Sequence, residues 1–219
     1  MKTIVLSFDD AVMSQRTFVA PLLKELGFNA TFFICRWGDE WRSQHGEYLM
    51  GSEEIHELSE MGFDIGNHTW SHLMLKDMTP ESLGEEIDRL DDFLRTAKVP
   101  QPVSFAYPGG PGAKYAHDVL KKRGYRCART VREVAFDPKT DDPFDFPSVA
   151  LQDNEPERFA KALPLCTEER PLALLFHGVP DVVHPWVTQT PEGFRKYMNF
   201  LKEGGYRVIS FRDYMANLA

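Results

Sequence analysis

The chain has 219 residues, of which 42% are hydrophobic and 26% are charged, and its formal net charge is −8. These values indicate a globular chain with one core, and we expect a single domain, residues 1–219. The acidic balance offers no basic surface for phosphates, so we expect no nucleic-acid partner. We also expect no membrane partner, because no run approaches the roughly 18 apolar residues of a membrane span.

The start of the chain has no signal-peptide pattern. Met1 leads directly into an apolar run, without a charged leader or a small-residue cleavage site. This predicts a cytoplasmic location, although a mature secreted form or a trimmed chain would begin in the same way. The three cysteines are widely spaced and show no CxxC pair, so they predict neither a disulfide framework nor a structural zinc site.

The first segments predict a strand, a helix and a second strand. Residues 3–6 are an apolar run typical of a buried strand, residues 14–26 carry apolar side chains at helical spacing, and residues 30–35 form a compact β-type run. Strands joined by a helix pair in parallel. Residues 36–51 show no period, and we expect a long loop there with exposed aromatic side chains.

The alternation of strands and helices continues to the end of the chain. The predicted helices are 52–62, 79–94, 114–123, 156–163, 191–201 and 211–218. The predicted strands are 63–68, 103–107, 125–130, an irregular one within 144–149, 171–176 and 206–210. About seven or eight β/α units without internal repeats predict an α/β fold that closes as a distorted (β/α) barrel, with a doubly wound sheet as the alternative.

Two adjacent carboxylates, Asp9 and Asp10, directly follow the first strand. Ligands of α/β folds bind beyond the carboxyl ends of the strands, which is where this pair falls. Adjacent carboxylates repel each other, so a folded chain tolerates them there only beside a cation, a basic partner or open water. The alternative is that Asp10 simply caps the following helix.

Histidines follow two other predicted strands. His68 and His72, four residues apart, can reach one ion, and one carboxylate would complete a set of two histidines and an aspartate with open positions. His177 follows the strand at 171–176 and suits a general acid. The HxxxH pattern alone occurs by chance in many sequences, but three such groups after three strands together predict a site.

These motifs resemble those of the polysaccharide deacetylases of carbohydrate esterase family 4. Residues 7–10, 68–72 and 175–177 are similar to the first, second and last motifs of that family, and residues 105–110 to a variant of the third. The resemblance spans residues 3 to about 211. It implies a distorted (β/α)7 barrel that removes N- or O-acetyl groups from sugars with one divalent metal, usually zinc, with cobalt, nickel and manganese as alternatives.

The resemblance also implies a role for each matched residue. Asp10, His68 and His72 would bind the metal. Asp9 would be the general base, and His177 would be the general acid.

The third motif departs from the family pattern. Its usual arginine, which pairs with the catalytic aspartate, is replaced by Ala106, so Asp9 lacks that partner. Arg129 or Arg132, at the end of the next predicted strand, would substitute. The backbone N–H of Gly109 would lie where the family stabilises the oxyanion.

Four further residues have two interpretations or incomplete support. The fourth motif, which orients the acid histidine, is not recognisable, and Asp181 or Asp153 would have to orient His177. Trp186 either lines the substrate cleft or packs the last loop, and Tyr107 lies either in the pocket floor or in the core.

The sequence favours a metal-dependent hydrolase that removes acetyl groups from N-acetylated amino sugars or oligosaccharides, of the chitooligosaccharide or peptidoglycan type. The second interpretation is an amidohydrolase on a small nitrogen compound, allantoinase- or cyclic-imidase-like, because the altered third motif weakens the assignment to sugars. The third is a carbohydrate-binding barrel without activity, although a pure binder has no use for a base and an acid. The natural substrate and the oligomeric state stay open.

Overall fold

The computed structural model describes residues 1–152 and 155–218. Its strands are β1 (Thr3–Phe8), β2 (Thr31–Ile34), β3 (Asp64–Asn67), β4 (Ser104–Ala106), β5 (Cys127–Arg129), β6 (Ser148–Ala150), β7 (Leu172–Phe176) and β8 (Arg207–Ile209). Its helices are α1 (Ala20–Leu26), α2 (Asp39–His45), α3 (Ser52–Glu60), α4 (Pro80–Thr96), α5 (Lys114–Lys122), α6 (Pro156–Ala162), α7 (Pro191–Glu203) and α8 (Phe211–Ala216). None of the helices in the described residues is long and apolar enough to cross a membrane.

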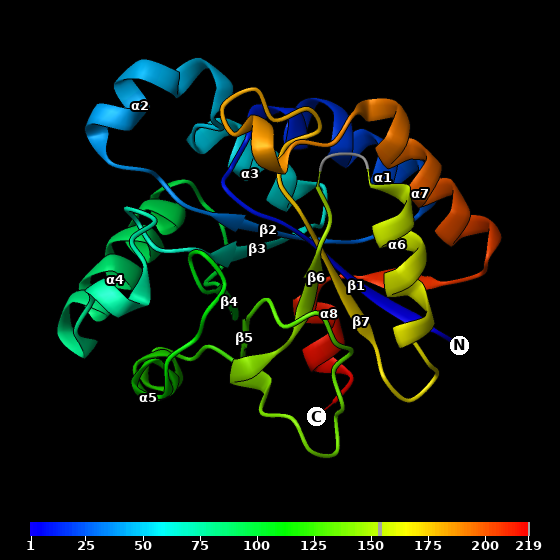
Figure 1. Cartoon of the computed structure of the whole chain (residues 1–219). Coiled ribbons are helices and arrows are strands. Elements are labelled where there is room, and N and C mark those ends of the chain that lie inside the picture. Colours follow the sequence, from blue (N-terminus) through cyan, green and yellow to red (C-terminus); the bar gives the residue numbers. More distant parts are fainter. Residues whose placement is uncertain (153–154, 219) are drawn as a thin grey trace.

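Seven strands form a parallel sheet in the order β5-β4-β3-β2-β1-β7-β6 (Figure 1). The two outer strands meet through Phe146, which precedes β6 and bridges in parallel to Arg129 of β5. Its N–H donates to the Ala128 carbonyl at 2.9 Å, and its carbonyl accepts from the Thr130 N–H at 2.7 Å. The sheet is therefore nearly closed into a barrel, as predicted, and the doubly wound alternative is wrong.

The eighth strand, β8, pairs with the same edge of β1 as β2 does, but nearer the amino end of β1. β8 pairs with residues 3–5 of β1, whereas β2 pairs with residues 7 and 8 of the same strand. β8 thus occupies the amino-terminal part of the edge that β1 shares with β2.

Aromatic side chains fill the barrel interior and the end where α8 sits. Phe146 stacks on Phe136 with 4.0 Å between ring centroids, and Phe211, the first residue of α8, meets Phe146 edge-on at 5.0 Å. The Phe211 N–H donates to the Thr31 hydroxyl at 2.8 Å, which ties α8 to the start of β2. Because α8 covers the amino ends of the strands, the opposite end of the barrel is left for the site.

The structure differs from the expected elements in two places. The sequence of residues 36–51 predicts a loop, but the segment contains α2 and a 3₁₀ turn over Gly46–Tyr48. α2 buries none of its residues, so it has no apolar face to produce a helical period. The helix expected over 14–26 begins with a π-helical segment, Gln15–Val19, before α1.

Candidate metal centre and active site

The carboxyl ends of the strands carry the ionisable residues that the sequence singled out. Asp9 and Asp10 follow β1, His68 follows β3 and His177 follows β7. Arg129 is the last residue of β5. All five line one cavity of about 440 Å³, because parallel strands place their carboxyl ends on one face of the barrel.

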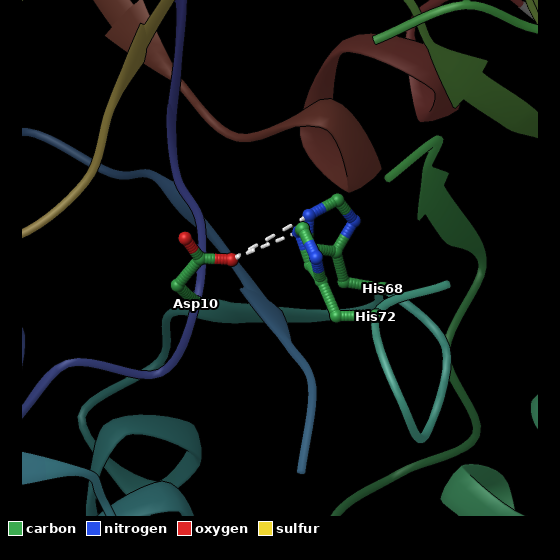
Figure 2. A group of neighbouring side chains, drawn as sticks. All are labelled: Asp10, His68 and His72. Atoms are coloured by element: carbon green, nitrogen blue, oxygen red, sulfur yellow. Dashed lines mark ion pairs between the residues drawn. The ribbon is translucent and has the colours of Figure 1, made fainter. Parts of the chain in front are cut away.

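Asp10, His68 and His72 converge on one point (Figure 2). Oδ1 of Asp10 lies 3.4 Å from Nε2 of His72 and 3.7 Å from Nε2 of His68, and the three atoms lie within 4.8 Å of one another. Nδ1 of His68 donates to the Ala106 carbonyl at 2.8 Å, since a carbonyl can only accept. The lone pair of His68 is therefore on Nε2, the atom that faces Asp10.

The protonation of this cluster also suits a cation. Burial is the main cause that lowers the pKa of His68 and of His72 to about 3, so both rings are neutral, the form that binds metals. Burial, followed by the charge of Asp9, raises the pKa of Asp10 well above its usual range. A bound cation would offset both effects on Asp10. The residues present therefore fit a divalent metal.

The turn after β1 is held by two side chains that the sequence did not assign to the site. The indole N–H of Trp37 donates to the Asp10 carbonyl at 3.3 Å. The buried amide of Gln15 donates to the carbonyl of Asp9, and to that of His177 at 3.4 Å. Asp10 itself has a left-handed φ of 78°, a strained conformation that such support maintains.

Asp9 is paired with a buried arginine. Nη2 of Arg129 donates to Oδ2 of Asp9, and the Arg129 side chain is 1% exposed. Oδ1 of Asp9 is buried and has no hydrogen-bond partner among the described residues. Arg132, the other candidate partner, donates instead to the carbonyl of Asp145 at 2.7 Å.

His177 lies beside the same cluster, but Asp181 does not orient it. Nε2 of His177 is 3.8 Å from Oδ2 of Asp10, and burial is the main cause that lowers the pKa of His177 to about 4. The carboxylate of Asp181 accepts from the backbone N–H groups of Gly178, Val183 and His184 at 3.3, 3.0 and 2.7 Å. Those bonds fix the loop after β7. The second candidate for this role, Asp153, lies outside the described residues.

The loop after β4 places Gly109 in the cavity wall. Residues 107–110 form a four-residue turn, closed by a hydrogen bond of 3.0 Å from the Gly110 N–H to the Tyr107 carbonyl. Pro108 is the second residue of the turn, and Gly109 is the third, with a φ of 69°. This is the pattern of a type II turn, whose third position requires a positive φ. A Cβ on Gly109 would also lie 2.2 Å from Sδ of Met74, so both the conformation and the space favour glycine.

Tyr107 lies in the core and not in the pocket, which corrects its placement among the substrate-binding residues. Its ring is fully buried against Phe105, and its hydroxyl donates to the Phe144 carbonyl at 2.9 Å. The alternation of side chains along β4 explains the difference: Ala106 faces the barrel interior with Val5, whereas Phe105 and Tyr107 belong to the core under α4 and α5.

Aromatic side chains form the outer wall of the cavity. Trp186 lines it and is 62% exposed, in agreement with the cleft-lining alternative. Trp37, which precedes α2, also lines the cavity, and so do Trp41 within α2 and His184. The sequence shows that residues 36–51 are rich in aromatic side chains, but no pattern in the sequence indicates that this segment contacts the loop after β7.

Comparison with known proteins finds relatives of this chain. The profile of the polysaccharide deacetylase family matches residues 1–128, more than half of the chain. The chain is 28% identical over 220 residues to the peptidoglycan-N-acetylglucosamine deacetylase of Bacillus cereus, covering 97% of this chain and 87% of that protein. It is 26% identical over 137 residues to Bacillus subtilis YxkH, covering 61% of this chain and 46%, about half, of that relative.

Solved structures share the fold. PdaA of Bacillus subtilis, a family 4 carbohydrate esterase, superposes with a TM-score of 0.67 at 21% identity, over 100% of this chain and 82% of that one. A family 4 carbohydrate esterase from Streptomyces lividans, solved in complex with acetate, gives a TM-score of 0.62 at 15% identity, over 94% and 91% of the two chains. These similarities establish the barrel architecture.

Proposed function

The chain belongs to the polysaccharide deacetylase family, and from that premise we propose that it is a metal-dependent hydrolase that removes the acetyl group from an N-acetylated amino sugar, free or within an oligosaccharide of the chitooligosaccharide or peptidoglycan type. One observation carries the proposal: the Asp10, His68 and His72 ligand atoms converge within 4.8 Å in a cavity that also contains Asp9. The names of the relatives support the sugar substrate. We further propose that residues 1–219 act as one catalytic domain.

Asp10, His68 and His72 are the proposed ligands of one divalent ion. Two imidazole nitrogens and one carboxylate oxygen suit zinc, and the same set accommodates cobalt, nickel or manganese. A bound ion of this kind would polarise the acetyl carbonyl and make water easier to deprotonate.

Asp9 is the proposed general base. Its Oδ1 has no partner among the described residues and is available to take a proton from the attacking water, whose oxygen adds to the acetyl carbon. Its Oδ2 accepts a hydrogen bond from Arg129, which holds the carboxylate in place. We propose that Arg129 replaces the arginine that the third motif lacks at Ala106.

His177 is the proposed acid for the leaving nitrogen. When the C–N bond breaks, the nitrogen needs a proton to leave as an amine, and Nε2 of His177 lies next to the metal-binding residues, 3.8 Å from Asp10. Because its pKa is about 4, the ring is neutral at rest and must gain a proton during turnover. Asp9, which takes a proton from the water, is the nearby group that can release one.

A backbone N–H at Gly109 is the proposed donor to the oxyanion. The glycine lines the cavity, and it adds no side chain of its own beside its N–H. Such a donor stabilises charge that exists only near the transition state, and therefore lowers the barrier.

An amidohydrolase acting on a small nitrogen compound is the second candidate. Ala106 departs from the sugar-deacetylase motif, and a cavity of about 440 Å³ is within the size range of small-molecule sites.

Acetate release from N-acetylglucosamine oligomers, measured together with the bound metal, tests the proposal. We expect acetate from the metal-loaded protein and none from Asp9→Asn, which retains its metal. Bound metal without acetate from any acetylated sugar, but with hydrolysis of a cyclic imide or ureide, would favour the second candidate. Protein without metal whose activity survives His68→Ala would contradict both.

A further inference from the structure

His184 is a buried polar side chain for which the proposed mechanism has no use. It is 5% exposed and lines the same cavity as the metal-binding residues. Its Nδ1 lies 3.5 Å from a carboxylate oxygen of Asp181. Neither ring nitrogen has a hydrogen-bond partner among residues 1–152 and 155–218, and Nε2 lies on the side of the ring away from Asp181. A buried ring nitrogen without a partner costs free energy, which a ligand hydroxyl in the cavity would recover.

The His184 ring is held in one orientation. Its backbone N–H donates to Oδ1 of Asp181 at 2.7 Å. The imidazole stacks on Trp37 with 4.9 Å between centroids and on Trp41 with 5.7 Å, at interplanar angles of 26° and 9°. Burial raises the pKa of Asp181, but hydrogen bonds and charge from His184 lower it further, and the net result is a pKa below its usual value. A charged carboxylate beside Nδ1 favours a proton on that atom and leaves Nε2 as an acceptor.

His184 is adjacent to the metal-binding residues and to an exposed aromatic platform. The indole of Trp37 that stacks on His184 also stacks on His72, at 4.4 Å between centroids. On the other side, Trp186 meets the His184 ring edge-on at 5.5 Å and is 62% exposed. An exposed indole next to a fixed polar atom in a cavity is a site for a ligand with one apolar and one polar face.

We propose that His184 and Trp186 form a sugar-binding subsite beside the metal centre, in which Nε2 of His184 accepts a hydrogen bond from a ring hydroxyl and the Trp186 indole covers the C–H face of the same pyranose. A pyranose has this combination of faces, whereas a small planar amide has no ring hydroxyl for Nε2. The inference rests on the proposed function and commits it to a saccharide with at least two sugar units, one at the metal and one at this subsite.

Binding of the glucosamine tetramer, which carries no acetyl group to hydrolyse, tests the subsite apart from catalysis. The probe is titrated calorimetrically into the zinc-loaded full chain. His184→Phe keeps a ring against Trp37 and Trp41 but removes Nε2, and we expect the Kd to rise about tenfold, the loss of roughly one hydrogen bond. We expect Trp186→Ala to weaken binding at least as much. In turnover of the acetylated tetramer, both variants should raise KM and leave kcat within about threefold of wild type.

His45→Phe is the matched control. His45 stacks on Trp41 at 4.2 Å between centroids, as His184 also does, but its Nδ1 lies 3.1 Å from the Trp41 carbonyl and it does not line the cavity. Binding by His45→Phe should equal wild type. The proposal is overturned if His184→Phe binds the tetramer like wild type, or if His45→Phe weakens binding equally.

The outcomes also separate the subsite from the proposed function. Tetramer binding that depends on His184, without acetate release from any sugar, would reject the deacetylase and retain the subsite. Acetate release with equal kcat/KM for monomer and tetramer, in wild type and in His184→Phe, would retain the deacetylase and reject the subsite.

Discussion

Ala106 and Arg129 are direct partners across the β4–β5 strand pair, and Arg129 forms the ion pair with Asp9. The side chain of Ala106 faces the barrel interior and is too short to reach a carboxylate. The guanidinium therefore enters the site from the neighbouring strand, at the same level of the barrel. This arrangement gives Asp9 a buried cationic partner without an arginine in the third motif.

Removal of Arg129 is expected to reduce turnover and leave the metal bound. Arg129→Ala leaves Asp9 buried and unpaired, which should lower kcat by about 10- to 100-fold and the free energy of unfolding by about 3–5 kcal/mol. Bound zinc, measured by elemental analysis, should stay near the wild-type level. Arg129→Lys keeps a charge and should fold when Arg129→Ala does not. Arg132→Ala is the control, since among the described residues Arg132 donates to a backbone carbonyl at the surface and does not contact Asp9. Unchanged turnover in Arg129→Ala would contradict the role of the pair.

Loss of one proposed ligand is expected to release the metal. His72→Ala removes Nε2, which lies 3.4 Å from Asp10, and should weaken zinc binding by 100-fold or more, beyond the roughly 10- to 100-fold typical of an outer-shell partner. Competition with a chromophoric chelator gives the affinity. His45→Ala, which removes a histidine outside the cavity, should bind zinc like wild type. Equal zinc affinity in the two variants would rule out His72 as a ligand.

The metal-free protein is expected to lose stability as the pH falls from about 6.5 to 4. The pKa of His177 is lowered from 6.5 to about 4, so in this range the unfolded chain binds a proton there that the folded chain does not. By linkage, the free energy of unfolding then decreases with falling pH, by about 1 kcal/mol per pH unit for this group. Urea unfolding at several pH values should therefore give a shallower dependence for His177→Gln than for wild type. Parallel curves would show that His177 has an ordinary pKa.

Gly109 is expected to tolerate no side chain. Gly109→Ala combines a φ of 69° with a contact of 2.2 Å to Met74, and should cost about 1–3 kcal/mol of stability and lower kcat by distorting the turn. Gly124→Ala is the matched control. Gly124 also has a positive φ (85°), but it has open space around its Cβ position and does not line the cavity. It should lose about 1–2 kcal/mol and retain full kcat. A kcat for Gly109→Ala equal to that of Gly124→Ala would argue against an oxyanion donor in this turn.

The sequence alone determined the alternation of strands and helices and the positions of the candidate ligands. Continuous apolar runs that end in ionisable residues, such as the run before Asp9 and the one before His177, identify buried parallel strands and the face on which they end. The spacing of His68 and His72 is a local property, and their shared loop after β3 brings both to one point. Local patterns of this kind are readable because neighbours in sequence remain neighbours in the fold.

Only the tertiary structure decided which distant residues complete the site. Arg129 reaches Asp9 across 120 positions of sequence, and the order of strands around the barrel, not any motif, determines that approach. The Asp181 carboxylate accepts from the backbone of the loop that carries His184 and does not orient His177. Trp37, before α2, and Trp41, within α2, stack on His184 of that loop, although α2 has no apolar period of its own. These contacts depend on how the barrel closes and how its loops pack above it. Since that packing is a property of the whole chain, no single segment of the sequence contains it.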